Sequence, residues 1–323
     1  MKPNLFLIAL FTGVACVLGA HAQLSYDNSD SPGAVGAYQT PDDLGGTSSP
    51  NSLTAVANGV YVSMAQQVNL YALPHSTNLP PTCTFATNFS KGMAVDTVGR
   101  LWVTNTGSRQ VTTYRKGTCH RTKLTLNEPN GVPFDVAISR NGTVYVADIV
   151  DSAGNHGVVS VYKKGTTTPS STLTDEKMTT ARAIAVDRSG NVFVSCVRER
   201  RNACIIEFAN GQMPGKYLDV QVGIAAGLEI DTQQNLLVDD PGAREIKSFA
   251  PPYQGVRTTA FPLRGSSDFG KLDAANKNFY ASNFSQGRVD VFSYPSGAYE
   301  YSITNGLVQP NAVIGIAVDP ASK

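Results

Sequence analysis

The chain has 323 residues, of which 41% are hydrophobic, 8% aromatic and 16% charged. A disordered chain would contain fewer apolar residues and a large net charge, so this composition indicates a folded protein. The 26 Lys and Arg balance 25 Asp and Glu, which argues against a partner bound through bulk charge, such as nucleic acid or an anionic membrane. Abundant Gly, Pro, Tyr and Phe are typical of strands and turns.

The N-terminal residues have the pattern of an export signal. Lys2 precedes an apolar run from Leu5 to Leu18, and Gly19-Ala20-His21-Ala22 follows. This pattern predicts a signal peptide over residues 1–22, cleaved after Ala22, and therefore a secreted or periplasmic protein. The alternative is an uncleaved anchor, but a membrane-spanning helix needs about 20 apolar residues. We expect no transmembrane anchor in the mature chain.

The next segment differs from the rest of the chain in composition. Residues 23–50 are rich in Ser, Asp, Gly and Pro and have no periodicity, which predicts a flexible N-terminal lead before a single domain at 51–323. Removal of the signal, which contains Cys16, leaves Cys83, Cys119, Cys196 and Cys204. An even number of cysteines in an exported chain favours disulfides, and four cysteines allow three pairings.

An internal repeat predicts the fold. Each unit has an apolar strand ending in a polar residue, a turn, and a second strand, as in Gly92–Asp96 with Leu101–Asn105. The polar residues that end the first strands are Asp96, Ser139, Asp187, Asp231, Asp273 and Asp319. Their intervals are 43, 48, 44, 42 and 46 residues, a period typical of β-propeller blades. The first strands are apolar on both faces, as inner strands between neighbouring blades must be.

These units predict an all-β, six-bladed propeller of four-stranded antiparallel blades. The first blade is expected to contain strands at Leu53–Ala57, Val60–Ser63 and Val68–Tyr71. A last strand near 314–319 has no second strand after it, so we expect it to close the ring against the N-terminal blade. A seventh, composite blade is the alternative.

The repeat units at 94–105, 137–148 and 185–196 make the sequence similar to a known group of propellers. They resemble NHL-repeat and SMP-30/gluconolactonase-like proteins, over nearly everything from Leu53 to Asp319. The resemblance implies the propeller fold. It does not select one function, because such propellers include lactonases, lyases and binding modules.

The propeller frame favours one pairing of the cysteines. Cys196 ends a second strand and Cys204 begins the third strand of the same blade, so a disulfide would close that hairpin. Cys83 and Cys119 fall near the starts of fourth strands in neighbouring blades. We therefore predict the disulfides Cys83–Cys119 and Cys196–Cys204.

One column of residues on the inner strands breaks the repeat. The residues two positions before the strand ends are Ala94, Ala137, Ala185, Glu229, Lys271 and Ala317. Four alanines indicate a crowded axis, and a charged group there is costly unless it is paired or faces a polar channel. Glu229 and Lys271 therefore form either a structural ion pair or part of a functional pocket.

A second column could hold a metal. The residues that end the second strands are Asn105, Asp148, Cys196, Asp240 and Asn283. Their oxygens could bind a hard divalent cation, or each could cap its own turn. The gluconolactonase resemblance implies one metal held by a Glu, two Asn and an Asp, and Pro129-Asn130-Gly131 resembles one Asn-bearing tripeptide of that family. The sequence departs from the family at 223–227, where Pro-Asp-Gly is missing, and it lacks a Glu at the start of the first blade.

These observations lead to two functional hypotheses. The first is an exported, monomeric binding or scaffold module for a small molecule or a protein, with no required cofactor. It follows from a regular repeat without a complete catalytic constellation. The second is a metal-dependent hydrolase of a lactone or similar ester, which would hold one divalent cation such as Ca, Zn or Mn.

Overall fold

The computed structural model describes residues 55–73, 79–198, 203–255, 257, 259–307 and 313–319. All of them belong to one compact unit, Ser48–Lys323. The predicted signal peptide and the predicted N-terminal lead lie outside the described residues. Within the described ranges, no helix has the length and apolar character needed to cross a membrane.

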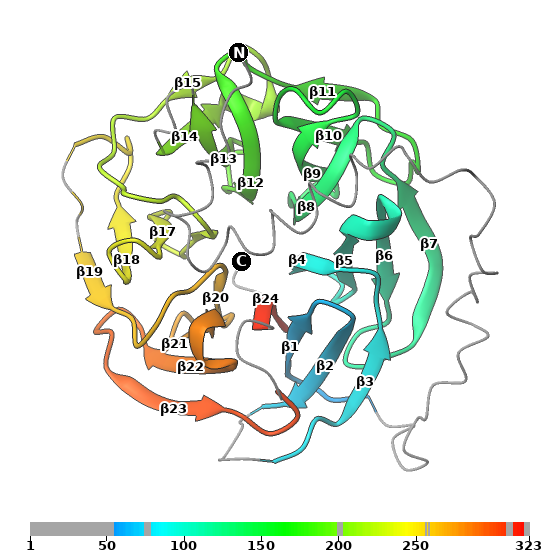
Figure 1. Cartoon of the computed structure of the whole chain (residues 1–323), viewed down its shortest axis with the longest axis vertical. Coiled ribbons are helices and arrows are strands. Elements are labelled where there is room, and N and C mark those ends of the chain that lie inside the picture. The colour runs from blue at the N-terminus through cyan, green and yellow to red at the C-terminus, as the bar shows by residue number, and fades with distance from the viewer. Residues whose placement is uncertain are drawn as a thin grey trace, which may run out of the picture. The chain divides into compact units, whose positions relative to one another are not determined.

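The strands form six separate four-stranded antiparallel sheets around a common centre (Figure 1). The first blade contains β24 (Val313–Asp319), β1 (Gly59–Met64), β2 (Gln67–Ala72) and β3 (Cys83–Ala86). The second contains β4 (Ser90–Val95), β5 (Leu101–Asn105), β6 (Gln110–Tyr114) and β7 (Arg121–Asn127). The third contains β8 (Gly131–Ile138), β9 (Val144–Asp151), β10 (Val158–Tyr162) and β11 (Ser171–Leu173).

The remaining three blades repeat this order. The fourth contains β12 (Met178–Val186), β13 (Val192–Arg198), β14 (Ala203–Phe208) and β15 (Lys216–Tyr217). The fifth contains β16 (Leu228–Ile230), β17 (Leu236–Asp240), β18 (Glu245–Phe249) and β19 (Thr259–Pro262). The sixth contains β20 (Gly270–Leu272), β21 (Asn278–Asn283), β22 (Arg288–Ser293) and β23 (Tyr299–Ile303). Six blades, and not seven, are therefore present in the described part of the chain, and the predicted fold is confirmed.

The polar residue at the end of each first strand shapes the turn that follows it. The Asp96 carboxylate accepts hydrogen bonds from the backbone N–H groups of Val98 and Arg100, at 3.0 and 2.8 Å. Asp231 likewise accepts from the N–H of Asn235 at 2.7 Å. A carboxylate that bonds its own backbone two to four residues on fixes a tight turn, which explains why the repeat keeps an acid there.

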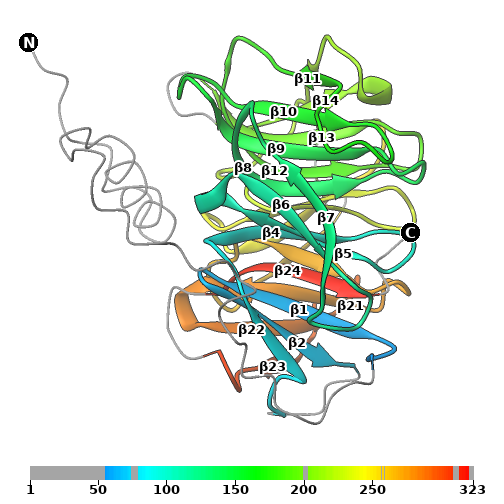
Figure 2. The same cartoon turned by 90° about the vertical axis from the view of Figure 1, so that its right-hand side faces the viewer.

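The C-terminal strand closes the ring, as predicted. β24 pairs antiparallel with β1, with Gly59 opposite Asp319 and Val62 opposite Ile316 (Figure 2). Every residue of β24 is buried. The inner strand expected at 53–57 is wrong for residues 55–57, which form no strand, and 53–54 lie outside the described residues. β24 pairs with the inner edge of β1 instead, so the C-terminal strand is the inner strand of the first blade.

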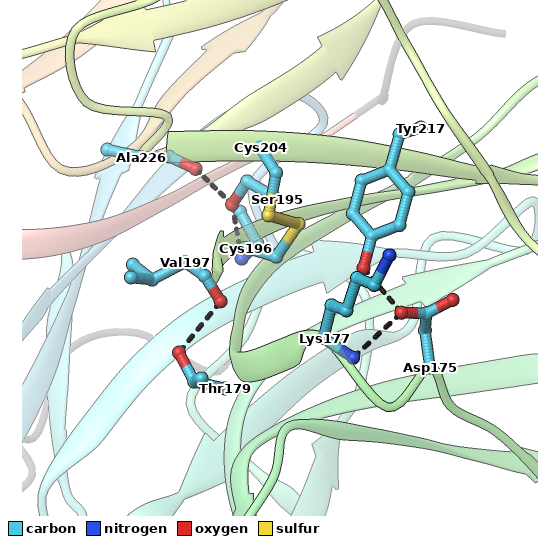
Figure 3. The surroundings of a disulfide bond; sticks show 10 residues. Asp175, Lys177, Thr179, Ser195, Cys196, Val197, Cys204, Tyr217 and Ala226 are labelled. Atoms are coloured by element: carbon cyan, nitrogen blue, oxygen red, sulfur yellow. Dashed lines mark hydrogen bonds between the residues drawn. A yellow bond between two sulfur atoms is a disulfide. The ribbon is translucent and has the colours of Figure 1, made fainter. Parts of the chain in front are cut away.

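Both predicted disulfides are present. Cys83–Cys119 joins β3 of the first blade to the turn before β7 of the second, with Cα atoms 6.1 Å apart. Cys196 and Cys204 lie directly opposite each other on β13 and β14, with Cα atoms 4.9 Å apart (Figure 3). Two disulfides indicate that the protein folds in an oxidising compartment, such as the periplasm or the extracellular space.

Candidate ligand sites on the propeller axis

A pocket of about 500 Å³ lies on the axis where the inner strands end. Its wall contains every member of the column that was expected at the axis: Ala94, Ala137, Ala185, Glu229, Lys271 and Ala317. Its mouth carries several of the acids that end these strands, among them Asp96, Asp187, Asp231 and Asp319. We call this space the axial pocket. The small alanine side chains leave the room that it occupies.

Glu229 and Lys271 form an ion pair in the wall of the axial pocket. The Nζ atom of Lys271 lies 3.0 Å from Oε2 of Glu229 and donates to the carbonyl of Leu228 at 3.1 Å. The two side chains are 15% and 12% exposed. The structure thus contains both features that the sequence left as alternatives, an ion pair and a polar wall of a pocket.

Two further carboxylates, Asp135 and Asp239, are buried near Lys271. Burial raises the pKa of Asp135 to about 6 and that of Asp239 to about 7, although the positive charge of Lys271 acts in the opposite direction on both. Burial alone would lower the pKa of Lys271. The negative charges of Glu229 and Asp135, with a smaller contribution from Asp239, outweigh that effect and raise it.

Asp135 and Asp239 differ in how their oxygens are satisfied. Asp135 accepts hydrogen bonds from the N–H groups of Val136 and Ile184, at 2.8 and 3.0 Å. Asp239 accepts from the Ser267 hydroxyl at 3.0 Å, and its other oxygen is buried without a partner. Both residues are missing from the sequence-based candidates.

A second group of charges lies further along the axis, and sequence reasoning missed it as well. These charges belong to another column of the repeat, three positions before the column that contains Ala94, Glu229 and Lys271. Its members lie on the inner strands or just before them, and they are Lys91, Phe134, Arg182, Ala226, Asp268 and Ile314. Lys91, Arg182 and Asp268 are only 3, 4 and 7% exposed. We call Lys91, Phe134, Arg182 and Asp268 the axial cation cluster.

β-Bulges place the axial cation cluster on the axis. The register of the first two strands shifts between Ser90 and Met93 in the second blade, and between Ala181 and Ile184 in the fourth. A bulge re-aims the side chains of the bulged strand. As a result, Arg182 of the fourth blade reaches the vicinity of Asp268 at the sixth, across the intervening blade.

The axial cation cluster has few internal bonds. Nη2 of Arg182 and Oδ1 of Asp268 are 3.7 Å apart, and the buried Nε of Arg182 has no hydrogen-bond partner. Lys91 Nζ and Arg182 Cζ each lie 5.8 Å from the ring centroid of Phe134. Burial lowers the pKa of Lys91 to about 8, although the charge of Asp268 acts in the opposite direction.

The second-strand column does not converge on one site. Asp240 accepts hydrogen bonds from the N–H groups of Gly223 and Ile224 and forms a 2.7 Å ion pair with Lys247. Asn283 accepts from the N–H of Gln286 at 3.2 Å. The other members bond within their own blades as well: Asn105 to Thr112, Asp148 to Ser160, and Cys196 to Cys204.

Asn130 and Asp148 are the two metal-ligand candidates that the fold brings close together. The Asn130 amide donates to the Ser160 hydroxyl at 3.0 Å, and Asp148 lies 3.0 Å from the same hydroxyl. Glu128 lies 2.7 Å from it and shares this buried site. Among the described residues, no group of three or more His, Cys, Asp or Glu side chains has a geometry that could hold a metal ion.

Comparisons with known proteins identify the fold. No protein-family model matches the chain, and no curated protein does. A structure of a nidogen/laminin complex matches with a TM-score of 0.67 and 17% identity, over 81% of this chain and 98% of that one. A luciferin-regenerating enzyme matches with a TM-score of 0.53 and 12% identity, over 71% and 79%. Regucalcin from Agrobacterium tumefaciens, described as a calcium-binding protein, matches with a TM-score of 0.53 and 13% identity, over 72% and 78%.

These matches place the protein in a structural class. It is a six-bladed β-propeller that resembles NHL-type and SMP-30-type propellers at the level of the fold. The neighbours include a structure of a nidogen/laminin complex, an enzyme and a protein described as calcium-binding, so the fold does not select one function.

Proposed function

We propose that this protein is an exported binding module that takes a small polar ligand into the axial pocket. The observation that carries the proposal is the Glu229–Lys271 ion pair in the wall of the axial pocket, at positions where the other four inner strands carry alanine. Natural ligand sites are concave, of roughly 300–1,000 Å³, and largely apolar with a few polar groups that orient the ligand. The axial pocket has this size, and its lining combines apolar side chains of the inner strands with charged side chains.

Export is part of the proposal. The two disulfides support an oxidising compartment. The sequence pattern at 1–22 supports a signal peptide cleaved after Ala22, so that the mature chain begins at Gln23.

The charges around the axial pocket narrow the class of ligand. Five acidic and four basic side chains line it: Asp96, Asp187, Glu229, Asp231 and Asp319, with Lys116, Arg140, Arg188 and Lys271. This near balance favours a neutral or zwitterionic ligand over a strongly charged one. Glu229 would accept a hydrogen bond from a hydroxyl or ammonium group, and Lys271 would donate one to a hydroxyl or carboxylate group.

A thermal-shift screen of the full mature chain against monosaccharides and free amino acids tests the proposal. At least one probe should raise the melting temperature in a saturable way. Glu229→Gln keeps the shape of the side chain and removes its charge, so it should weaken binding of that probe. No response to any probe, or an undiminished response in Glu229→Gln, would count against the axial pocket as the site.

The alternative, a metal-dependent hydrolase of a lactone or similar ester, rests on the resemblance to SMP-30-type proteins and on the meeting of Asn130 with Asp148. Metal analysis after extensive dialysis separates it from a binding module. Stoichiometric Ca, Zn or Mn would favour the hydrolase, and metal at trace level would favour the binding module.

A further inference from the structure

The axial cation cluster contains more positive charge than its own carboxylate can neutralise. Lys91 and Arg182 supply two cations, and Asp268 supplies one carboxylate, which stands 3.7 Å from Arg182 Nη2 and therefore beyond hydrogen-bond distance. The Lys91 ammonium lies 5.8 Å from the centroid of the Phe134 ring and forms no salt bridge within the described residues. The buried Nε of Arg182 has no hydrogen-bond partner, and a buried donor without an acceptor is costly to the fold.

The neighbouring carboxylates are engaged elsewhere. Asp135 accepts two backbone hydrogen bonds, and the positive charge that lowers its pKa is that of Lys271 in the pocket wall. Asp239 accepts from Ser267 and also interacts with Lys271. Burial, together with the like charge of Asp268, raises the pKa of Asp239 to about 7, so Asp239 is partly neutral at physiological pH. Neither carboxylate supplies an acceptor to Lys91 or Arg182.

We propose that the axial cation cluster binds a small oxyanion, namely a carboxylate, phosphate or sulfate group. Such an anion would accept hydrogen bonds from the Lys91 ammonium and the Arg182 guanidinium, and it would supply the missing negative charge. Lys91 and Arg182 share two neighbours, the ring of Phe134 and the carboxylate of Asp268, and the positive charge of Arg182 acts on Lys91. An anion bound among these side chains would therefore interact with both cations.

The proposed anion site is separate from the axial pocket. None of the four residues of the axial cation cluster lines the pocket. Asp96 stands at the mouth of the axial pocket, and Lys91 lies five residues before it in the same strand region. A strand rises about 3.3 Å per residue, so Lys91 is well separated from the pocket mouth along the axis. The anion site therefore lies toward the opposite end of the inner strands, and ligands of the two sites need not compete.

Isothermal titration calorimetry on the full mature chain tests the site with three probes: inorganic phosphate, sulfate and acetate, each at constant ionic strength set with chloride. We expect one-to-one binding of at least one probe, and the relative affinities show which kind of anion the site prefers. Lys91→Met should weaken that binding by about tenfold or more, since it removes a charge-assisted hydrogen bond. Asp268→Asn should tighten it, because the competing carboxylate loses its charge.

Lys163→Met is the matched control, because Lys163 is an exposed lysine with no role in the axial cation cluster. It should bind the anion as the wild type does. The proposal is overturned if the wild type shows no heat of binding at millimolar concentrations of all three probes, or if Lys91→Met binds with wild-type affinity. Should Lys91→Met fail to fold, Asp268→Asn decides, and an unchanged or weaker affinity in that variant overturns the proposal.

Discussion

Lys271 lies near three carboxylates, so we expect its removal to affect the stability of the fold more than removal of the charge of its partner Glu229. It forms a 3.0 Å ion pair with Glu229, and its charge also acts on the buried Asp135 and Asp239. Removal of Lys271 would leave Glu229 without its ion-pair partner and would take a favourable positive charge away from the buried Asp135 and Asp239. Removal of the charge of Glu229 would leave Lys271 with two carboxylates nearby.

We therefore predict an asymmetric double-mutant cycle. Lys271→Met should lower the free energy of unfolding by about 3–5 kcal/mol, because it leaves buried carboxylates unpaired. Glu229→Gln should cost less, about 1–2 kcal/mol. The double variant should cost clearly less than the sum of the two, since the partners are in contact. Urea unfolding measures all four corners, and equal, additive effects below 1 kcal/mol would contradict an ion pair that contributes to stability.

Asp239 predicts a pH dependence of stability. Burial raises its pKa from 3.8 to about 7, so the folded state holds the proton to a higher pH than the unfolded state does. The resulting stabilisation is complete below the unfolded pKa and is lost as the pH rises through about 7. Asp239→Asn removes this loss. Its stability relative to the wild type should therefore increase from pH 4 to pH 7.

Thermal unfolding at a series of pH values measures this difference, and the contributions of other titrating groups cancel in it. Asp219→Asn is the control, because Asp219 is exposed. It should track the wild type at every pH. A constant difference between Asp239→Asn and the wild type would show that Asp239 stays ionised in the folded protein.

The residues of the axis show where sequence reasoning reaches its limit. Glu229 and Lys271 could be found because they replace alanine at one fixed position of the repeat. Lys91 and Arg182 were missed because they stand three positions before that column, and strict alternation along a strand points such residues to the opposite face. The bulges in β4 and β12 reverse that direction, and nothing in the sequence marks them. Asp135 could have been predicted as a site residue. It lies two positions before Ala137, on the same face of the strand, and it is a charged residue in an otherwise apolar strand.

At the level of the elements, the repeat predicted the strands well because first strands end in a polar residue that hydrogen-bonds the backbone of the next turn. Asp96 and Asp231 bond the backbone of the turn that follows them, and a turn of this kind leaves a visible pattern. The inner strand of the first blade was placed wrongly at 53–57, because its true partner comes from the other end of the domain. Sequence periodicity is local and cannot show which end supplies the closing strand.

The two disulfides should contribute unequally to stability. Cys83–Cys119 closes a loop with a sequence separation of 36 residues and joins two blades, whereas Cys196–Cys204 has a separation of 8 within one hairpin. Loop-closure entropy then predicts a loss of about 4 kcal/mol for the Cys83→Ser/Cys119→Ser variant and about 2.5 kcal/mol for Cys196→Ser/Cys204→Ser. Urea unfolding of both double variants without reductant measures the losses. A larger loss from the hairpin pair would contradict this explanation.

At the scale of the whole molecule, closure of the ring determines which side chains meet on the propeller axis. Closure by β24 brings Ala317 beside the alanines of the other inner strands, so the axial pocket is complete only when both ends of the domain meet in the first blade. The same closure gathers charges from distant parts of the sequence. Period and composition could predict the ring, but the identity of the groups that meet at its centre depends on bulges and on closure.

A calorimetric titration of the best small-molecule probe into a pocket-blocked variant tests most directly whether the axial pocket is the binding site. Ala94→Phe places a large side chain on the pocket wall, and Val98→Phe, four residues away, adds the same ring at a position that is 67% exposed and outside the pocket. We predict that Ala94→Phe, folded as judged by its own melting curve, binds the probe at least about tenfold more weakly than the wild type, a loss of about 1.4 kcal/mol. Val98→Phe should bind as the wild type does. Wild-type affinity in a folded Ala94→Phe variant would contradict a ligand site on the propeller axis.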